Sequence, residues 1–150
     1  MKTRPALVFG AVGAISAFGI FALLGTPIGK GWGALPAVTG LSAGVVGSLL
    51  WTRFFRQRPP TVLRGALAGS LTALLAYPLI WYLILLGYWF WSFVAPEYRE
   101  VVPPWTAVPA ALVFAAWGIV LTGWVSVPVG AVTGGLLALW DLRRQRPTAI

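Results

Sequence analysis

The sequence predicts an all-α protein, a polytopic bundle of four transmembrane helices. Hydrophobic residues make up 59% of the 150 residues and charged residues only 9%, whereas water-soluble domains carry about 25% charged residues. Four uncharged stretches, 5–29, 31–52, 65–96 and 101–140, separate short charged islands. Each exceeds the roughly 20 helical residues that cross a bilayer core. None shows the short alternating segments of a barrel, so helices are the expected spanning elements.

The first stretch follows two basic residues, a pattern shared with secretory signals. Its apolar run is longer than the roughly 7–15 residues of a signal core, and Leu23 stands where cleavage needs a small residue. We therefore expect a retained first span. The second stretch ends at Trp51 beside an arginine cluster, and the fourth ends in the same way at Trp140. Tryptophans at these points are typical of a membrane interface.

The third and fourth stretches are longer than one crossing requires. As single helices they would reach about 48 Å and about 60 Å, against a core of about 30 Å. Counted from the basic ends, the outer boundary falls near Leu85 and Val120, and apolar residues continue past it over 88–93 and 105–117. Four explanations compete: tilting or kinking at internal prolines, segments lying flat in the interface, burial against a partner, or division into six spans. No polar turn divides the third stretch, which disfavours six spans.

Basic residues indicate the orientation. In a four-span topology nine of the eleven Lys and Arg residues share one side, and only Lys30 and Arg99 lie on the other. Because cytoplasmic loops carry the excess of basic residues, both termini are expected in the cytoplasm of a cell (inner or cytoplasmic) membrane. The chain is then one integral membrane domain, 1–150, composed of a first hairpin at about 5–52, a cytoplasmic basic loop 53–64, a second hairpin at about 65–140 and a cytoplasmic tail 141–150.

The formal net charge of +8 is explained by this topology, so no nucleic-acid partner is expected. The bilayer itself is the expected partner, and the basic clusters are candidates for contact with anionic lipid headgroups. The simpler interpretation is that they only orient the chain. The candidate headgroup residues are Arg53, Arg56, Arg58, Arg143, Arg144 and Arg146.

Short strings suggest an internal repeat. Arg-Gln-Arg-Pro occurs at 56–59 and 144–147, Ala-Val-Thr-Gly at 37–40 and 131–134, and a proline with Gly-Ala five residues later at 5–11 and 60–66. They are consistent with a helical hairpin duplicated in parallel orientation, a 2+2 arrangement related to known transporter repeats. The alternative is that small residues and terminal arginines recur in any membrane helix.

Glycines recur at four-residue spacing in three of the stretches. Lipid chains are as apolar as leucine, so membrane helices associate through close backbone contact, which this spacing permits. We expect helix packing within the chain, with a homodimer contact as the alternative. The residues are Gly40, Gly44, Gly65, Gly69, Gly130 and Gly134.

The composition excludes most catalytic chemistry. The chain has no His or Cys and one Met, and no ionisable residue lies within a span, so cofactor ligation and proton relays lack their usual side chains. The remaining polar atoms of the spans are hydroxyls, which most often bond back to their own helix. No catalytic residue, metal or cofactor is expected. An enzyme using Glu97 and Glu100, or the Asp141 and Arg144 pair, is a third and weaker interpretation.

These features favour a non-enzymatic accessory or assembly subunit. The apolar residues past the predicted outer boundary would pack against another membrane component, either a protein partner or a second copy of the chain. The contact would be made through Trp89, Trp91, Trp105 and Trp117. Pro103 and Pro104 would stiffen the preceding loop. The alternative function is a small permease or lipid-handling protein, with a groove lined by Ser and Thr between the duplicated hairpins.

Overall fold

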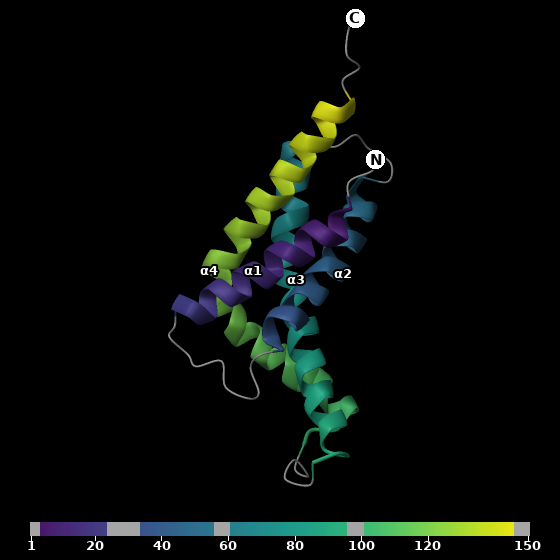
Figure 1. The fold of residues 1–150 in the computed structure, drawn as a ribbon, viewed down its shortest axis with the longest axis vertical. Coiled ribbons are helices and arrows are strands. Elements are labelled where there is room, and N and C mark those ends of the chain that lie inside the picture. The colour runs from purple at the N-terminus through teal and green to yellow at the C-terminus, as the bar shows by residue number, and fades with distance from the viewer. Residues whose placement is uncertain (1–3, 24–33, 56–60, 96–100, 146–150) are drawn as a thin grey trace, which may run out of the picture.

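A computed structural model describes residues 4–23, 34–55, 61–95 and 101–145, which form four helices (Figure 1). These are α1 (Pro5–Leu23), α2 (Leu35–Phe55), α3 (Val62–Trp91) and α4 (Pro104–Gln145). The described ranges contain no strand, which confirms the all-α prediction. The helices α2, α3 and α4 are long and apolar enough to cross a membrane, and α1 has a shorter apolar stretch, Pro5–Ile20.

Proline or threonine lies at or next to the first residue of each helix. Pro5 and Pro104 are the first residues of α1 and α4, and Pro36 is the second of α2. Proline suits these positions because its missing N–H would have no intrahelical partner and its φ is already helical. At α3 the cap is Thr61, whose hydroxyl accepts a hydrogen bond from the backbone N–H of Arg64 at 3.3 Å.

The two longest helices are continuous. α3 has 30 residues and runs through Pro78, and α4 has 42 residues and runs through Pro109 and Pro128. At 1.5 Å per residue α4 is about 63 Å long, twice the thickness of a bilayer core. The division into six spans is therefore not seen. The surplus residues extend the same helices instead of forming separate segments.

The helices form two antiparallel hairpins, α1 with α2 and α3 with α4, joined mainly by the packing of α2 on α3. By contrast, α1 makes few contacts with α4. In Figure 1, α1 and α2 lie along the upper and middle parts of the α3–α4 hairpin. Of the described helices, only α3 and α4 reach the lower end of that view. The second hairpin thus extends well beyond the first.

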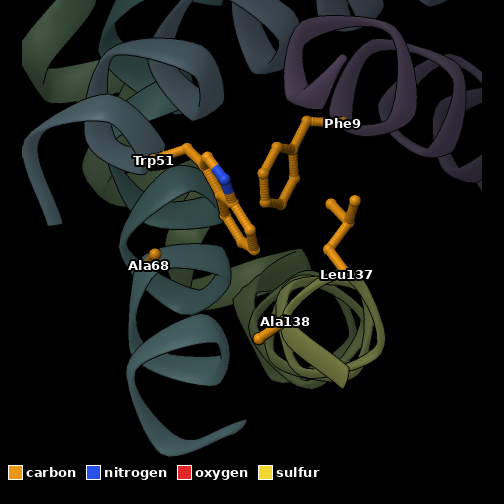
Figure 2. Packing of buried hydrophobic residues seen from close by; sticks show 5 residues of the cluster. All are labelled: Phe9, Trp51, Ala68, Leu137 and Ala138. Atoms are coloured by element: carbon orange, nitrogen blue, oxygen red, sulfur yellow. The ribbon is translucent and has the colours of Figure 1, made fainter. Parts of the chain in front are cut away.

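All four helices contribute to one hydrophobic core cluster (Figure 2). Phe9 of α1 and Trp51 of α2 have ring centroids 6.1 Å apart, and both are more than nine-tenths buried. Ala68 of α3, with Leu137 and Ala138 of α4, completes the cluster. The large rings come from the first hairpin and meet mostly small residues of the second, so the hairpins approach closely here.

Every described arginine lies at the same end of the fold, next to this cluster. Arg4 precedes α1, Arg53 is in the last turn of α2, Arg64 is in the first turn of α3, and Arg143 and Arg144 are in the last turn of α4. The helices therefore run past the predicted limits of the basic loop and the tail, since arginine is a good helix former. Basic side chains also favour the C-terminal turns of α2 and α4 through the helix dipole.

Candidate functional site

The α3–α4 hairpin contains a seam of direct backbone contact. Gly65 faces Gly134 and Gly69 faces Gly130, and a Cβ on any of the four would overlap backbone atoms of the facing glycine. At these positions only the hydrogen atom of a glycine fits between the backbones of α3 and α4. The four glycines therefore set both the distance and the register of α3 against α4.

The α1–α2 hairpin has a similar crossing. A Cβ on Gly40 would lie 2.9 Å from the carbonyl oxygen of Gly10, and one on Gly44 would lie 2.9 Å from that of Ala6. All six glycines singled out in the sequence thus lie at helix crossings within the chain.

Beyond the glycine seam, α4 continues to pack through alanines. Ala107, Ala111 and Ala115 follow at four-residue spacing and are at most 2% exposed. Trp81 of α3 stacks on Phe114 of α4 in the same region, with ring centroids 5.1 Å apart. This alanine seam was not predicted, although its four-residue spacing is visible in the sequence.

We define the aromatic arm as residues 82–91 of α3 and 104–117 of α4, the part of the second hairpin that extends past the first (Figure 1). The alanines of α4 are buried here, whereas several large side chains of the arm are exposed. Trp105 is 75% exposed, Trp117 64% and Trp91 55%. Trp89 differs, since it is half-buried against the rings of Phe90 and Phe93. Three of the four predicted contact tryptophans therefore lie on the surface.

One exposed stripe continues from the arm along α4. Val113, Trp117, Val120 and Trp124 follow at i, i+4, i+7 and i+11, and all four are at least 59% exposed. Residues at this spacing share one face of a helix. Trp124 was not among the predicted contact residues, yet it is as exposed as Trp105.

A second candidate site is a cavity of about 440 Å³ between the two hairpins, lined by all four helices. It extends from Phe9, at the core cluster, to Trp81, at the base of the aromatic arm. Most lining side chains are apolar, and the hydroxyl-bearing ones are Ser16, Thr39, Thr72, Tyr77, Thr122, Ser126 and Thr133.

Three of these hydroxyls form a cluster. The Tyr77 hydroxyl lies 2.6 Å from Oγ1 of Thr122 and 2.8 Å from Oγ of Ser126. The glycine register explains the meeting. Steps of four residues from the pair Gly69 and Gly130 lead along both helices to the pair Tyr77 and Thr122. Residues 45 positions apart in the sequence are thus brought together.

Most other hydroxyls bond within their own helix, as expected of membrane helices. Thr72 donates to the carbonyl of Ala68 and Thr133 to that of Val129, both at 2.7 Å. Ser42 is an exception, because its Oγ is fully buried and has no hydrogen-bond partner in the described part of the chain.

Replacing Ser42 by alanine is therefore expected to leave the free energy of unfolding unchanged or to raise it by about 1 kcal/mol, because a buried hydroxyl without a partner is destabilising. The matched control is Thr72→Ala, which breaks a formed bond and should cost about 1 kcal/mol. Unfolding of both variants in mixed micelles measures the difference. A larger loss for Ser42→Ala than for Thr72→Ala would contradict the assignment.

The basic candidates lie at the arginine end. Arg53, Arg143 and Arg144 are exposed, and the guanidinium of Arg144 lies 4.3 Å from the ring centroid of Trp140, in a cation–π contact. Arg56, Arg58 and Arg146 lie outside the described residues, as do Glu97 and Glu100. Among described side chains, no group of His, Cys, Asp or Glu could hold a metal ion.

Fold and surface together define an all-helical membrane protein built from two hairpins of unequal length. Comparison of the chain with protein-family models, with curated proteins and with solved structures finds no match.

Proposed function

We propose that this protein is a non-enzymatic accessory or assembly subunit, which docks to another membrane protein through the aromatic arm. The observation that carries the proposal is the exposure of Trp91, Trp105 and Trp117 on a part of the second hairpin that the first hairpin does not cover. Large exposed apolar patches mark interaction sites. Tryptophan is also the residue type most enriched among residues that dominate binding energy.

The length of α4 favours contact with a protein partner over contact with lipid alone. Membrane helices tilt by up to about 40°, at which a core of about 30 Å takes up roughly 26 residues. The uncharged part of α4, 104–140, is about ten residues longer. That excess falls in the aromatic arm when the arginine end is fixed at the interface. A protein surface would shield these apolar side chains where the hydrocarbon core does not reach.

The arm also indicates the chemistry of its partner. Its described residues carry no charged side chain, so the matching surface is expected to be apolar and itself to project from the membrane. Within the arm, Val113 and Trp117 lie one turn apart on the exposed face of α4 and suit an apolar groove between helices, because anchors at i and i+4 are typical of a helix laid in a groove.

Purification from native membranes in mild detergent tests the proposal. We expect a stoichiometric companion protein, and a second copy of this chain is the other outcome that involves the arm. A chain that purifies alone and monomeric would contradict docking.

We further propose a four-span topology with both termini in the cytoplasm of the cell membrane. It is supported by the arginines, which lie at the start of α1 and α3 and at the end of α2 and α4. The positive-inside rule places that end in the cytoplasm, and the aromatic arm then lies outside.

Single cysteines test this topology without background, because the chain has no cysteine of its own. A membrane-impermeant maleimide applied to intact cells should label Val102→Cys, near the start of α4. It should label Thr52→Cys, near the end of α2, only after lysis. Both positions are exposed. Labelling of Thr52→Cys in intact cells would reverse the proposed orientation.

We also propose that the two hairpins are an internal repeat. In the aligned strings Gly10 corresponds to Gly65 and Gly40 to Gly134. The structure pairs Gly10 with Gly40, and Gly65 with Gly134. Equivalent residues thus make equivalent backbone contacts in the two hairpins, which supports a duplicated hairpin whose second copy has lengthened.

A further inference from the structure

We propose that the cavity between the hairpins binds a neutral single-chain lipid that carries one hydroxyl group, taken up from the surrounding bilayer. The site is separate from the aromatic arm and has its own lining. Binding there and docking of the arm can therefore succeed or fail independently.

The lining selects a neutral and mainly apolar ligand. None of the residues that line the cavity is Lys, Arg, Asp, Glu or His. A phosphate or carboxylate inside it would be a charge without a partner, which is strongly unfavourable in an apolar environment. Water is also poorly held by apolar walls. The volume of about 440 Å³ lies within the range of ligand pockets.

The shape of the cavity suits a chain. On α3 its lining runs from Gly69 to Trp81, about 18 Å at 1.5 Å per residue. On α1 it follows one helix face from Phe9 through Gly13 and Ala17 to Ile20. The lining thus extends over about three turns of α3 and of α1, which suits an extended chain.

Lipid can enter from the side. Leu121 of α4 lines the cavity and is also 65% exposed, so the wall at this point faces the surroundings of the protein. The few contacts between α1 and α4 leave this side of the bundle loosely packed. In a membrane, an opening here faces lipid chains.

The hydroxyl cluster provides the polar contact for the ligand. Tyr77, Thr122 and Ser126 have one hydroxyl proton each, and Thr122 also lies 2.9 Å from the carbonyl of Gly118. If Thr122 donates to that carbonyl, Tyr77 to Thr122 and Ser126 to Tyr77, then Ser126 retains its lone pairs as free acceptors. If Tyr77 instead donates to Ser126, the Ser126 hydroxyl donates to the backbone carbonyl of Thr122 at 3.2 Å and still keeps one lone pair. In both arrangements Ser126 has a free acceptor, to which a ligand hydroxyl can donate.

A diazirine derivative of cetyl alcohol, a long-chain alcohol, tests the site in the full-length protein in phosphatidylcholine nanodiscs. We expect saturable photolabelling of the cavity face of α1 and α4, competed by unlabelled cetyl alcohol. Ala17→Phe should reduce specific labelling about tenfold by filling the cavity. The matched control Ile15→Phe, at a side chain 71% exposed and outside the lining, should not. Thr39→Leu fills the same cavity from α2, should a bulky residue on α1 impair folding.

The hydroxyl cluster has its own variants. Tyr77→Phe and Ser126→Ala should each weaken binding of the alcohol probe about 3- to 10-fold, the range for loss of one hydrogen bond. Thr52→Ala, at an exposed hydroxyl outside the cavity, should have no effect. Labelling that is not saturable, or that persists in both cavity-filling variants, would overturn the proposal. Equal competition by cetyl alcohol and by the corresponding alkane would overturn recognition of the hydroxyl group.

Discussion

Replacing Gly69 by leucine is expected to lower the free energy of unfolding by about 3 kcal/mol or more, the upper range for overpacking at a close contact. A Cβ on Gly69 already overlaps the carbonyl group of Gly130. The overlapped atoms are backbone, which cannot move aside as the end of a side chain can. The two helices would have to separate, and the hydroxyl cluster and the alanine seam would lose their register with them.

The measurement is unfolding in mixed micelles, followed by circular dichroism. Gly87→Leu on the same helix is the matched control, because a Cβ there meets nothing within 4 Å. It should be neutral or slightly stabilising, since leucine favours a helix over glycine by somewhat under about 1 kcal/mol. Equal stability of the two variants would mean that the α3–α4 seam does not set the distance between these helices.

The second large effect is expected at the aromatic arm. Truncation of a tryptophan that anchors an interface costs about 2 kcal/mol or more, about 30-fold in affinity. Trp105→Ala and Trp117→Ala together should therefore abolish co-purification of the companion protein. The fold should be retained, because the arm is held by Ala107, Ala111 and Ala115, and the two tryptophans are 75% and 64% exposed.

Trp124→Ala is the control for this pair. Trp124 is equally exposed on the same helix, but it lies closer to the arginine end, outside the arm. It should keep the companion with at most a small loss. Loss of the companion in Trp124→Ala, with retention in the double variant, would move the docking surface from the arm to the middle of α4.

The sequence predicted what depends on length and local composition. Uncharged stretches predicted the helices, and paired glycines at four-residue spacing predicted positions that the structure places at helix crossings. Helix ends were less accurate. Charges marked the predicted boundaries, but Arg53, Arg64 and Asp141 all lie inside helices. Charged residues do not end a helix; they only prefer water or a headgroup at that depth.

What the sequence did not predict depends on register between helices. Tyr77 and Thr122 are neighbours only because Gly69 faces Gly130, and a single sequence does not say which glycine pair faces which. The split between buried alanines and exposed tryptophans in the arm has the same origin. Trp89 and Trp91 are two positions apart on α3, yet Trp89 is half-buried and Trp91 is 55% exposed. Both are tryptophans in the same apolar stretch, so composition alone does not distinguish their exposure.

Photo-cross-linking in intact native membranes tests the docking proposal most directly. Benzoylphenylalanine in place of Trp117 should cross-link to one specific protein, whereas the same residue in place of Ile15, exposed on α1, should capture none. We expect a single discrete adduct from Trp117, either with a companion subunit or with a second copy of the chain. Cross-links from Trp117 to lipid alone would contradict the assignment of the aromatic arm as a protein-docking surface.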